Sequence, residues 1–357
     1  MSTSLSETLV AHGQETAKFM ASDCTAGDWQ TWPVSFAKPF PAGNIVVVAM
    51  ASDFGVDAGL HVAAGVPVIR GISRTGFVLA MRNSDCASGS AGVHWLAVLE
   101  QPGIATSTPV EVRTGIMPAR YFDANCRSGD WQTWSWSFQR PLRSAPTVVG
   151  TAYRFPGTDS GFDLVGIPFT PEALPRGRWR LGAAVGVSSG VQPGRLAIAA
   201  RNSMGWPGLM GMNFVAVADT GGPIANMVCD AGVTSPVSLP GDSGGNVTQT
   251  LEIQFALPFL TPPIVLLTAS DAGLAPGEAA VALVGVAEDV STHGFRLAIH
   301  NSDCAAGRAA FNWVALGCGI GCGAGSAAPP PPTTPHPGGD TGTTTSPLSS
   351  GSRRGAV

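Results

Sequence analysis

The chain contains one order of sequence blocks three times, and this repeat constrains the fold more than any other feature. GDWQTW occurs at 27–32 and again at 129–134, and VTQTLEIQFALPF at 247–259 retains the QT, the following Phe and the Pro. An apolar run follows each copy, then a block ending in Asn-Ser, then a closing block that reads HWLAV, NFVAV or NWVAL. Such spacing indicates three units of domain size rather than the short repeats of a solenoid.

The repeat divides the chain into five parts. The second unit contains an insertion near 167–179, which we interpret as a long loop. The C-terminal part is rich in Pro, Thr, Gly and Ser and has almost no large apolar residues, so we expect it to be disordered. The parts are an N-terminal segment at 1–21, units one, two and three at 22–102, 112–220 and 225–318, and a tail at 323–357.

The composition favours strands. Only 12% of the residues are charged, whereas the chain contains 46 Gly and 29 Pro. Within each unit, short runs that are apolar or alternate between apolar and polar residues are separated by turn-forming residues, and no amphipathic helix is evident. The sequence therefore predicts an all-β protein of three tandem antiparallel six-stranded β-sandwiches. The recurring tryptophans lie at strand positions, so we expect most of them to pack in the cores.

Charge and hydropathy exclude several partners. The net charge is −4 and no Lys/Arg cluster stands out, so we expect no nucleic-acid partner. The longest apolar runs, at 45–51 and 262–269, are far shorter than the roughly 18 residues of a membrane span, and we expect a soluble protein. No secretory signal is visible at the N-terminus, so the localisation stays open, with action outside the cell or at its surface still possible.

The sequence also argues against an enzyme. GDSGG at 241–245 matches the nucleophile loop of trypsin-like proteases, but the histidine signature of those proteases is absent. CGIGC at 318–322 does not have CxxC spacing, and no second pair of ligands suggests zinc. We therefore expect no catalytic residues, no metal site and no cofactor.

The pentapeptide NSDCA occurs at 83–87 and again at 301–305, while unit two has NSMGW at 202–206. Asn, Ser and Asp favour turns because their side chains bond to the nearby backbone. The same side chains can also bind polar ligands. NSDCA is therefore either a structural turn used twice or a binding site used twice, and the sequence leaves both interpretations open.

The order of the blocks resembles the H-type lectin domain, the family of snail agglutinin and discoidin, over residues 22–318. In unit three the resemblance rests on Phe255, Pro258, Phe259, Pro262, Pro263, Ile264, Ser270, Asp271, Gly294, Phe295, Trp313 and Ala315. In unit one it rests on Trp29, Phe36, Pro39, Phe40, Asp53, Thr75, Gly76, Phe77, Trp95 and Ala97. Unit two is more diverged.

The resemblance implies a fold and a function. Members of the family are six-stranded sandwiches that form trimers and bind N-acetylgalactosamine or galactose between neighbouring protomers. Three copies in one chain would form a pseudo-trimer with three equivalent clefts, able to bind glycans or glycoproteins multivalently as in cell adhesion. By position, the resemblance assigns sugar contacts to two loops of the family. These are Asn83, Ser84, Asp85, Asn301, Ser302 and Asp303 after the TGF-type strand, and Asp242 and Asn246 near GDSGG.

The resemblance also implies two disulfides, Cys24–Cys86 and Cys229–Cys304, if the protein meets an oxidising compartment. Cys126 aligns with Cys24 but has no evident partner, so it is either free or paired with Cys318 or Cys322. The aromatic residue and the Arg of the family's cleft have no counterpart in units one and three. The alternative function is therefore a structural or assembly protein, such as a fibre, virion or surface component, that uses the sandwich without a sugar site.

Overall fold

The computed structural model describes most of the three units. All regular secondary structure in the described residues is β-strand, so the all-β prediction is confirmed. No helix that could span a membrane occurs in the described residues. The described residues are 10–20, 30–52, 65–83, 88–99, 110–122, 131–153, 180–181, 184–202, 208–218, 222–224, 227–240, 249–271, 283–301 and 306–318. The predicted disordered tail lies outside them.

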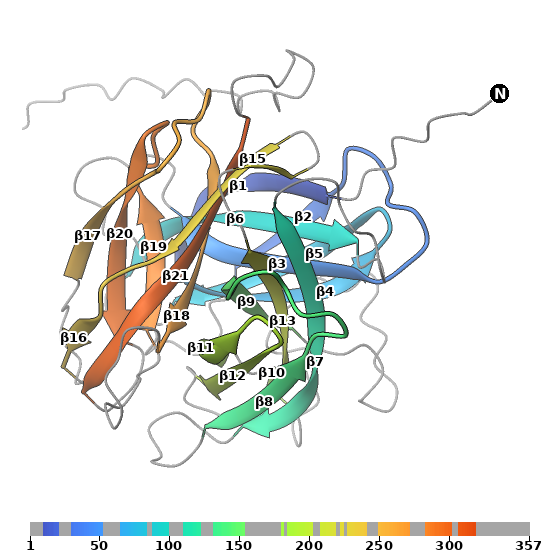
Figure 1. The fold of residues 1–357 in the computed structure, drawn as a ribbon, viewed down its shortest axis with the longest axis horizontal. Helices are drawn as coiled ribbons and strands as arrows, with labels where there is room; N and C mark the ends of the chain where they lie inside the picture. Colours follow the sequence, from blue (N-terminus) through green and yellow to red (C-terminus); the bar gives the residue numbers. More distant parts are fainter. Residues whose placement is uncertain are drawn as a thin grey trace, which may run out of the picture. The chain divides into compact units, whose positions relative to one another are not determined.

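The strands fall into three repeats of similar order (Figure 1). Repeat one comprises β1 (Val10–Met20), β2 (Gln30–Ser35), β3 (Ile45–Ser52), β4 (Gly65–Ser73), β5 (Gly76–Asn83) and β6 (Gly89–Leu99). Repeat two comprises β7 (Glu111–Phe122), β8 (Gln132–Ser137), β9 (Thr147–Tyr153), β10 (Arg180–Leu181), β11 (Ala184–Gln192), β12 (Arg195–Asn202) and β13 (Gly208–Ala218). Repeat three comprises β14 (Gly222–Ile224), β15 (Met227–Val233), β16 (Val237–Leu239), β17 (Gln249–Gln254), β18 (Ile264–Ser270), β19 (Leu283–Glu288), β20 (Gly294–Asn301) and β21 (Gly307–Gly317).

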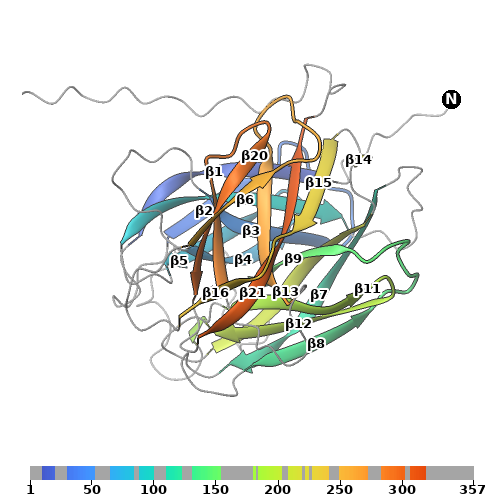
Figure 2. The ribbon, with the colours of Figure 1, turned by 60° about the vertical axis from the view of Figure 1, so that its left-hand side comes forward.

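Each of the three large sheets joins strands of two repeats. The first sheet has the order β1-β6-β3-β19-β20-β17, so half of it comes from repeat one and half from repeat three. A second sheet joins repeats two and one in the order β10-β13-β9-β4-β5-β2. The third joins repeats three and two, and Figure 2 shows its strands β11, β12 and β8 side by side. At every junction, β3 with β19, β9 with β4 and β18 with β11, the two strands are parallel. The repeats therefore form a closed cycle.

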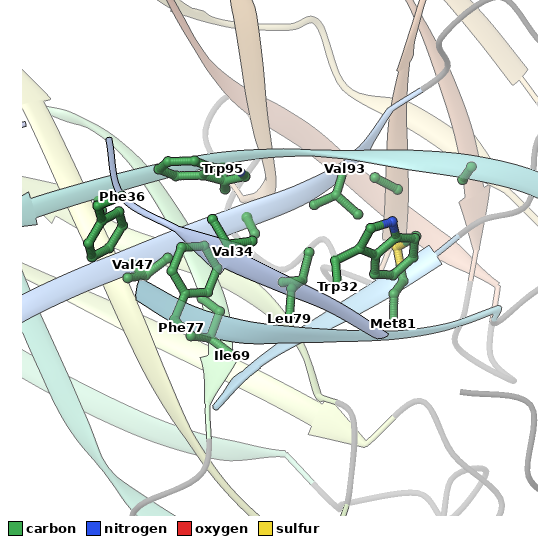
Figure 3. Packing of buried hydrophobic residues seen from close by; sticks show 14 of the residues in the cluster. Trp32, Val34, Phe36, Val47, Ile69, Phe77, Leu79, Met81, Val93 and Trp95 are labelled. Carbon is green, nitrogen blue, oxygen red and sulfur yellow. The ribbon is translucent and has the colours of Figure 1, made fainter. Parts of the chain in front are cut away.

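Each repeat has a core of aromatic and branched side chains between two layers of strands. In repeat one, the Phe77 ring lies 5.8 Å from Phe36 and 5.4 Å from Trp95, measured between ring centroids (Figure 3). In repeat three, Phe295 and Trp313 form the equivalent pair at 5.9 Å. Trp32, Trp95, Trp134 and Trp313 are all buried, which confirms the prediction that these tryptophans pack in the cores.

The cores are not independent of one another, because each repeat places at least one valine in the core of the next. Val68 of β4 lies in the core of repeat two, Val187 of β11 in that of repeat three and Val286 of β19 in that of repeat one. Burying such a side chain stabilises a fold by roughly 1.5–3 kcal/mol. A separated repeat would lose this burial and expose a sheet junction.

A fourth apolar cluster joins all three repeats. It contains side chains of the third and last strands of each repeat, among them Val46, Leu96, Val149, Val215, Leu266 and Val314. These strands are buried on both faces, because one face covers the core of its own repeat and the other belongs to this central cluster. That explains why their sequences read as nearly continuous apolar runs.

The first strand of each repeat carries a glycine against the closing aromatic residue. A Cβ atom on Gly13 would lie 2.5 Å from Cζ2 of Trp95, and one on Gly232 would lie 2.8 Å from the same atom of Trp313. Gly115 faces Phe214 in the same way, at 2.4 Å. Strand β1 therefore corresponds to β7 and β15, so repeat one begins within the 1–21 segment and not, as the sequence predicts, at residue 22.

Candidate functional site at the boundaries between repeats

The strand ends that carry the repeated polar blocks lie at one end of each repeat, which we call the loop end. In repeat one, Met20 at the end of β1 pairs with Gly89 at the start of β6. Asn83 at the end of β5 pairs with Gly65 at the start of β4. The third strand of each repeat runs toward the loop end and the fourth strand runs away from it, so a parallel junction between a third and a fourth strand makes the loop ends of adjoining repeats point in different directions.

At the loop end, the third strand of each repeat ends against a neighbouring repeat. Ser52, the last residue of β3, is opposite Ala287 of repeat three. Likewise, the last residue of β9 is opposite Ile69 of repeat one. In repeat three, Ser270 is opposite Ser188, and the following Asp271 N–H donates to the Ser188 carbonyl at 3.1 Å. The segments that follow β3, β9 and β18 therefore all start at boundaries between repeats.

Two of the eight sequence-predicted sugar contacts lie in described residues, and both are buried. Asn83 is 1% exposed and Asn301 is 4% exposed. The Asn301 Nδ2 group donates to the carbonyl of Pro240 at 2.7 Å, which fixes the end of β20 to the backbone beyond β16. This contact gives the Asn301 amide a structural role. The other six, Ser84, Asp85, Asp242, Asn246, Ser302 and Asp303, lie outside the described residues, so their role in ligand binding stays a prediction.

Polar side chains of the last strands link the repeats. One side chain at the same register position of β6, β13 and β21 reaches the backbone of the third strand in the neighbouring repeat. Sequence reasoning missed this role, although the signal is visible: each lies directly before the aromatic residue of the closing block. The contacts are Asn213 Nδ2 to Val47 O at 2.8 Å, Asn312 Nδ2 to Val148 O at 2.8 Å, and His94 Nδ1 to both N and O of Val265 at 3.1 Å.

His94 is the ionisable member of this set. The pKa of His94 is lowered to about 4, chiefly by complete burial and in smaller part by the nearby His12, while the backbone bond to Val265 acts in the opposite direction. The imidazole is therefore neutral at pH 7, and its unprotonated Nδ1 can accept the N–H of Val265. A neutral ring suits this position, because two of the three repeats use an uncharged Asn there.

A second layer of contacts uses threonine hydroxyls of the third strands. Thr151 Oγ1 accepts the Ala49 N–H at 2.8 Å and donates to the Ala49 carbonyl at 2.8 Å. Thr268 Oγ1 accepts the Gly150 N–H at 2.7 Å. Repeat one has Met50 at the corresponding position, opposite His94, so the third such contact is missing from the cycle.

A small cavity lies where these side chains meet. Its volume is about 30 Å³, and its lining includes Met50, Thr151 and Thr268 together with Val66, Val185 and Val284, so all three repeats contribute. A cavity of this volume holds at most a few water molecules and excludes a sugar. A sugar would therefore have to bind at the protein surface.

The predicted Cys229–Cys304 disulfide is wrong. Cys229 is a free, buried thiol near the start of β15, opposite Leu316 near the end of β21. Gly307 begins β21, so an extended strand of roughly 30 Å separates it from Leu316. Residue 304 precedes Gly307 by only three positions, whereas a disulfide requires Cα atoms within about 7 Å. Sequence alignment paired Cys229 with Cys24, which instead follows the end of its strand.

The remaining sequence predictions about chemistry fall outside the described residues. These include the predicted Cys24–Cys86 disulfide, Cys126, Cys322 and the GDSGG segment. Within the described ranges, no group of three His, Cys, Asp or Glu side chains is arranged to hold a metal ion. Comparison with known proteins finds no matching family model, no matching curated protein and no matching solved structure.

Proposed function

We propose that the protein is a non-enzymatic, multivalent carbohydrate-binding protein, a lectin of the H-type, with its sites at the loop-end boundaries between repeats. The observation that carries this proposal is that the third strand of each repeat ends against a neighbouring repeat, three times around a closed cycle. At each boundary, a loop segment of one repeat therefore begins beside a strand of the neighbouring repeat. The expected ligands are glycans that end in N-acetylgalactosamine or galactose.

The cyclic arrangement also supports a multivalent mode of action. Shared sheets and shared valines hold the three boundaries in one unit, so sites there would have a fixed spacing. Weak single sites gain overall affinity when a surface presents several sugars at a matching spacing. Glycoproteins or cell surfaces with dense glycans are the partners that such a unit fits.

A glycan array followed by calorimetric titration with N-acetylgalactosamine and with galactose tests the proposal. We expect saturable binding to at least one class of glycan on the array and a measurable heat with the matching monosaccharide. The absence of binding to any arrayed glycan, and to both sugars at millimolar concentration, would rule the lectin function out.

The second candidate is a structural or assembly module. It is favoured by the Asn301 contact with Pro240, because this contact uses a predicted sugar ligand to hold the backbone in place. The shared sheets would make a stiff building block for a fibre or surface particle. Negative glycan binding, together with self-association in sedimentation velocity, is the result that would favour this function.

A further inference from the structure

Two aromatic side chains are exposed at the same position of two repeats. Phe19 in β1 is 57% exposed and Tyr121 in β7 is 45% exposed. Both come directly before a fully buried residue that ends the strand, Met20 and Phe122 respectively. Both lie in the first strand of their repeat at the loop end, so the two rings are equivalent, and neither packs in a core.

Both rings lie on a sheet face that faces another repeat. Phe19 pairs with Ser90, which is on the same face of β6 as His94, and His94 contacts repeat three. In repeat two, Tyr121 pairs with position 209 of β13, four residues from the Asn213 that contacts repeat one, so by register Tyr121 lies on the Asn213 face of the sheet. Phe19 therefore lies at the boundary between repeats one and three, and Tyr121 at the boundary between repeats two and one.

In repeat one, a buried tryptophan fixes the strand segment that presents the ring. The Trp32 indole N–H donates to the Thr16 carbonyl at 2.9 Å. The Lys18 ammonium lies 4.8 Å from the centroid of the Trp32 ring, close enough for a cation–π contact. These contacts hold the Thr16 carbonyl and the Lys18 side chain at the register shift between Glu15 and Lys18, directly before the exposed ring.

Repeat two contains the same arrangement of a buried tryptophan, a cation and an exposed aromatic residue. The Trp134 indole N–H donates to the Pro118 carbonyl at 2.7 Å, and the Arg120 guanidinium lies 5.2 Å from the centroid of the Trp134 ring. Pro118 and Arg120 occupy the positions of Thr16 and Lys18 relative to the exposed aromatic residue. Such anchoring lowers the cost of ordering a binding residue, because the ring is already held in one place.

Repeat three lacks the exposed aromatic residue, the cation and the tryptophan of this arrangement. By register, Val237 replaces the cation and Ser238 the exposed aromatic residue, since the following Leu239 pairs with Gly307 at the start of β21. Leu251 takes the place of the tryptophan in the QT-containing block. The exposed ring, the cation and the indole are thus present together in two repeats and absent together in the third, which indicates that the three side chains act together.

The surroundings of the rings indicate the kind of ligand. On the face that carries Phe19, its cross-strand neighbour is Ser90, and the exposed polar side chains of Gln14 and His12 lie further along β1. A protein partner needs a contiguous apolar patch of several hundred Å², which a single ring cannot supply. An exposed aromatic ring with polar neighbours suits a pyranose, which has an apolar C–H face bordered by hydroxyl groups.

We propose that Phe19 and Tyr121 are the residues on which sugar rings stack, and that the protein therefore has two main sugar sites rather than three. This inference rests on the proposed lectin function and specifies the valency of its sites. The boundary that carries Ser238 has no ring for stacking and binds sugar weakly or not at all.

The test compares the full chain with Phe19→Ser, Tyr121→Ser and the double variant, each of which introduces the residue of repeat three. Calorimetric titration with N-acetylgalactosamine or galactose, whichever binds, should give two sites per chain in the wild type and one in each single variant. The double variant should bind about tenfold more weakly or not at all. Thermal unfolding should stay unchanged, because both side chains are exposed.

The outcomes distinguish the inference from the function on which it rests. Wild-type protein that binds no arrayed glycan overturns both. Wild-type binding that persists in the double variant, or three equal sites in the wild type, overturns only the stacking role. As a gain-of-site control, the triple variant Val237→Arg, Ser238→Tyr and Leu251→Trp should add a third sugar site. A folded triple variant that still binds two sugars per chain would count against the role of the ring, the cation and the indole.

Discussion

Nδ1 of His94 in repeat one lies 3.1 Å from both the amide nitrogen and the carbonyl oxygen of Val265 in repeat three. The same position in the other two repeats is Asn213 or Asn312, which donates to the equivalent carbonyl of a neighbouring repeat. One of three otherwise equivalent boundaries therefore depends on an ionisable group, which makes that boundary sensitive to acid.

We predict that the free energy of unfolding falls as the pH decreases from about 6.5 to about 4. Burial lowers the pKa of His94 to about 4, so in this window the unfolded chain binds a proton that the folded chain does not. Stability from this group is fully present above the unfolded pKa and is lost as the pH falls toward the folded value, at up to about 1.4 kcal/mol per pH unit. Urea unfolding at a series of pH values measures the slope.

The matched control for this prediction is His94→Asn, which installs the residue of repeats two and three. This variant should fold and should lose most of the slope between pH 6.5 and 4. The protonation of exposed groups would persist in the variant and can be subtracted. An unchanged slope in His94→Asn would show that His94 does not cause the acid sensitivity.

A second prediction concerns the threonine contacts across the boundaries. Thr268→Val keeps the shape of the side chain but removes the acceptor of the Gly150 N–H, leaving a buried donor unpaired. The free energy of unfolding should fall by about 1–3 kcal/mol in chemical denaturation. Thr250→Val, at an exposed position of β17, is the control and should change stability by less than about 0.5 kcal/mol.

Features of the fold that depend on neighbouring residues in the sequence were predicted, whereas features that depend on contacts between distant residues were not. The alternation of apolar residues and the repeated aromatic residues indicated strands and core positions, because neighbours along one strand decide both. Residues such as Trp95 and Trp313 were correctly expected in the cores for that reason. The junctions were not predicted, because pairs such as Ser52 with Ala287 join residues more than two hundred positions apart and carry no motif.

The first strand of each repeat was harder to recognise for a different reason. VAHGQETAKFM and EVRTGIMPARYF share only the glycine that faces the closing aromatic residue and the related endings AKFM and ARYF, because an edge strand is constrained mainly at its buried positions. The misplacement of this strand also caused the wrong pairing of Cys229. Of the candidate site, the sequence identified Asn83 and Asn301 but could not show that both amides are buried.

A third prediction tests the glycine contact. Gly13→Ala places a Cβ atom 2.5 Å from Cζ2 of Trp95, within a ring that is itself packed in the core of repeat one. We expect a loss of roughly 1–3 kcal/mol in the free energy of unfolding, the usual cost of overpacking. Gly194→Ala is the control, since its new Cβ would come no closer than 3.9 Å to Pro141. Equal stability of the two variants would mean that the Trp95 ring moves aside without cost.

The final prediction concerns the reactivity of Cys229. Burial raises the pKa of this thiol well above its usual range, and the neighbouring Asp230 carboxylate raises it further, so very little thiolate forms at pH 8. Native protein treated with iodoacetamide should therefore leave Cys229 unmodified in peptide mass spectrometry, whereas protein in urea should be alkylated there. Disulfide-linked peptides that contain Cys229 should be absent without reduction. Rapid alkylation of Cys229 in the native protein would contradict its position in the central cluster, where it packs against side chains of the last strands.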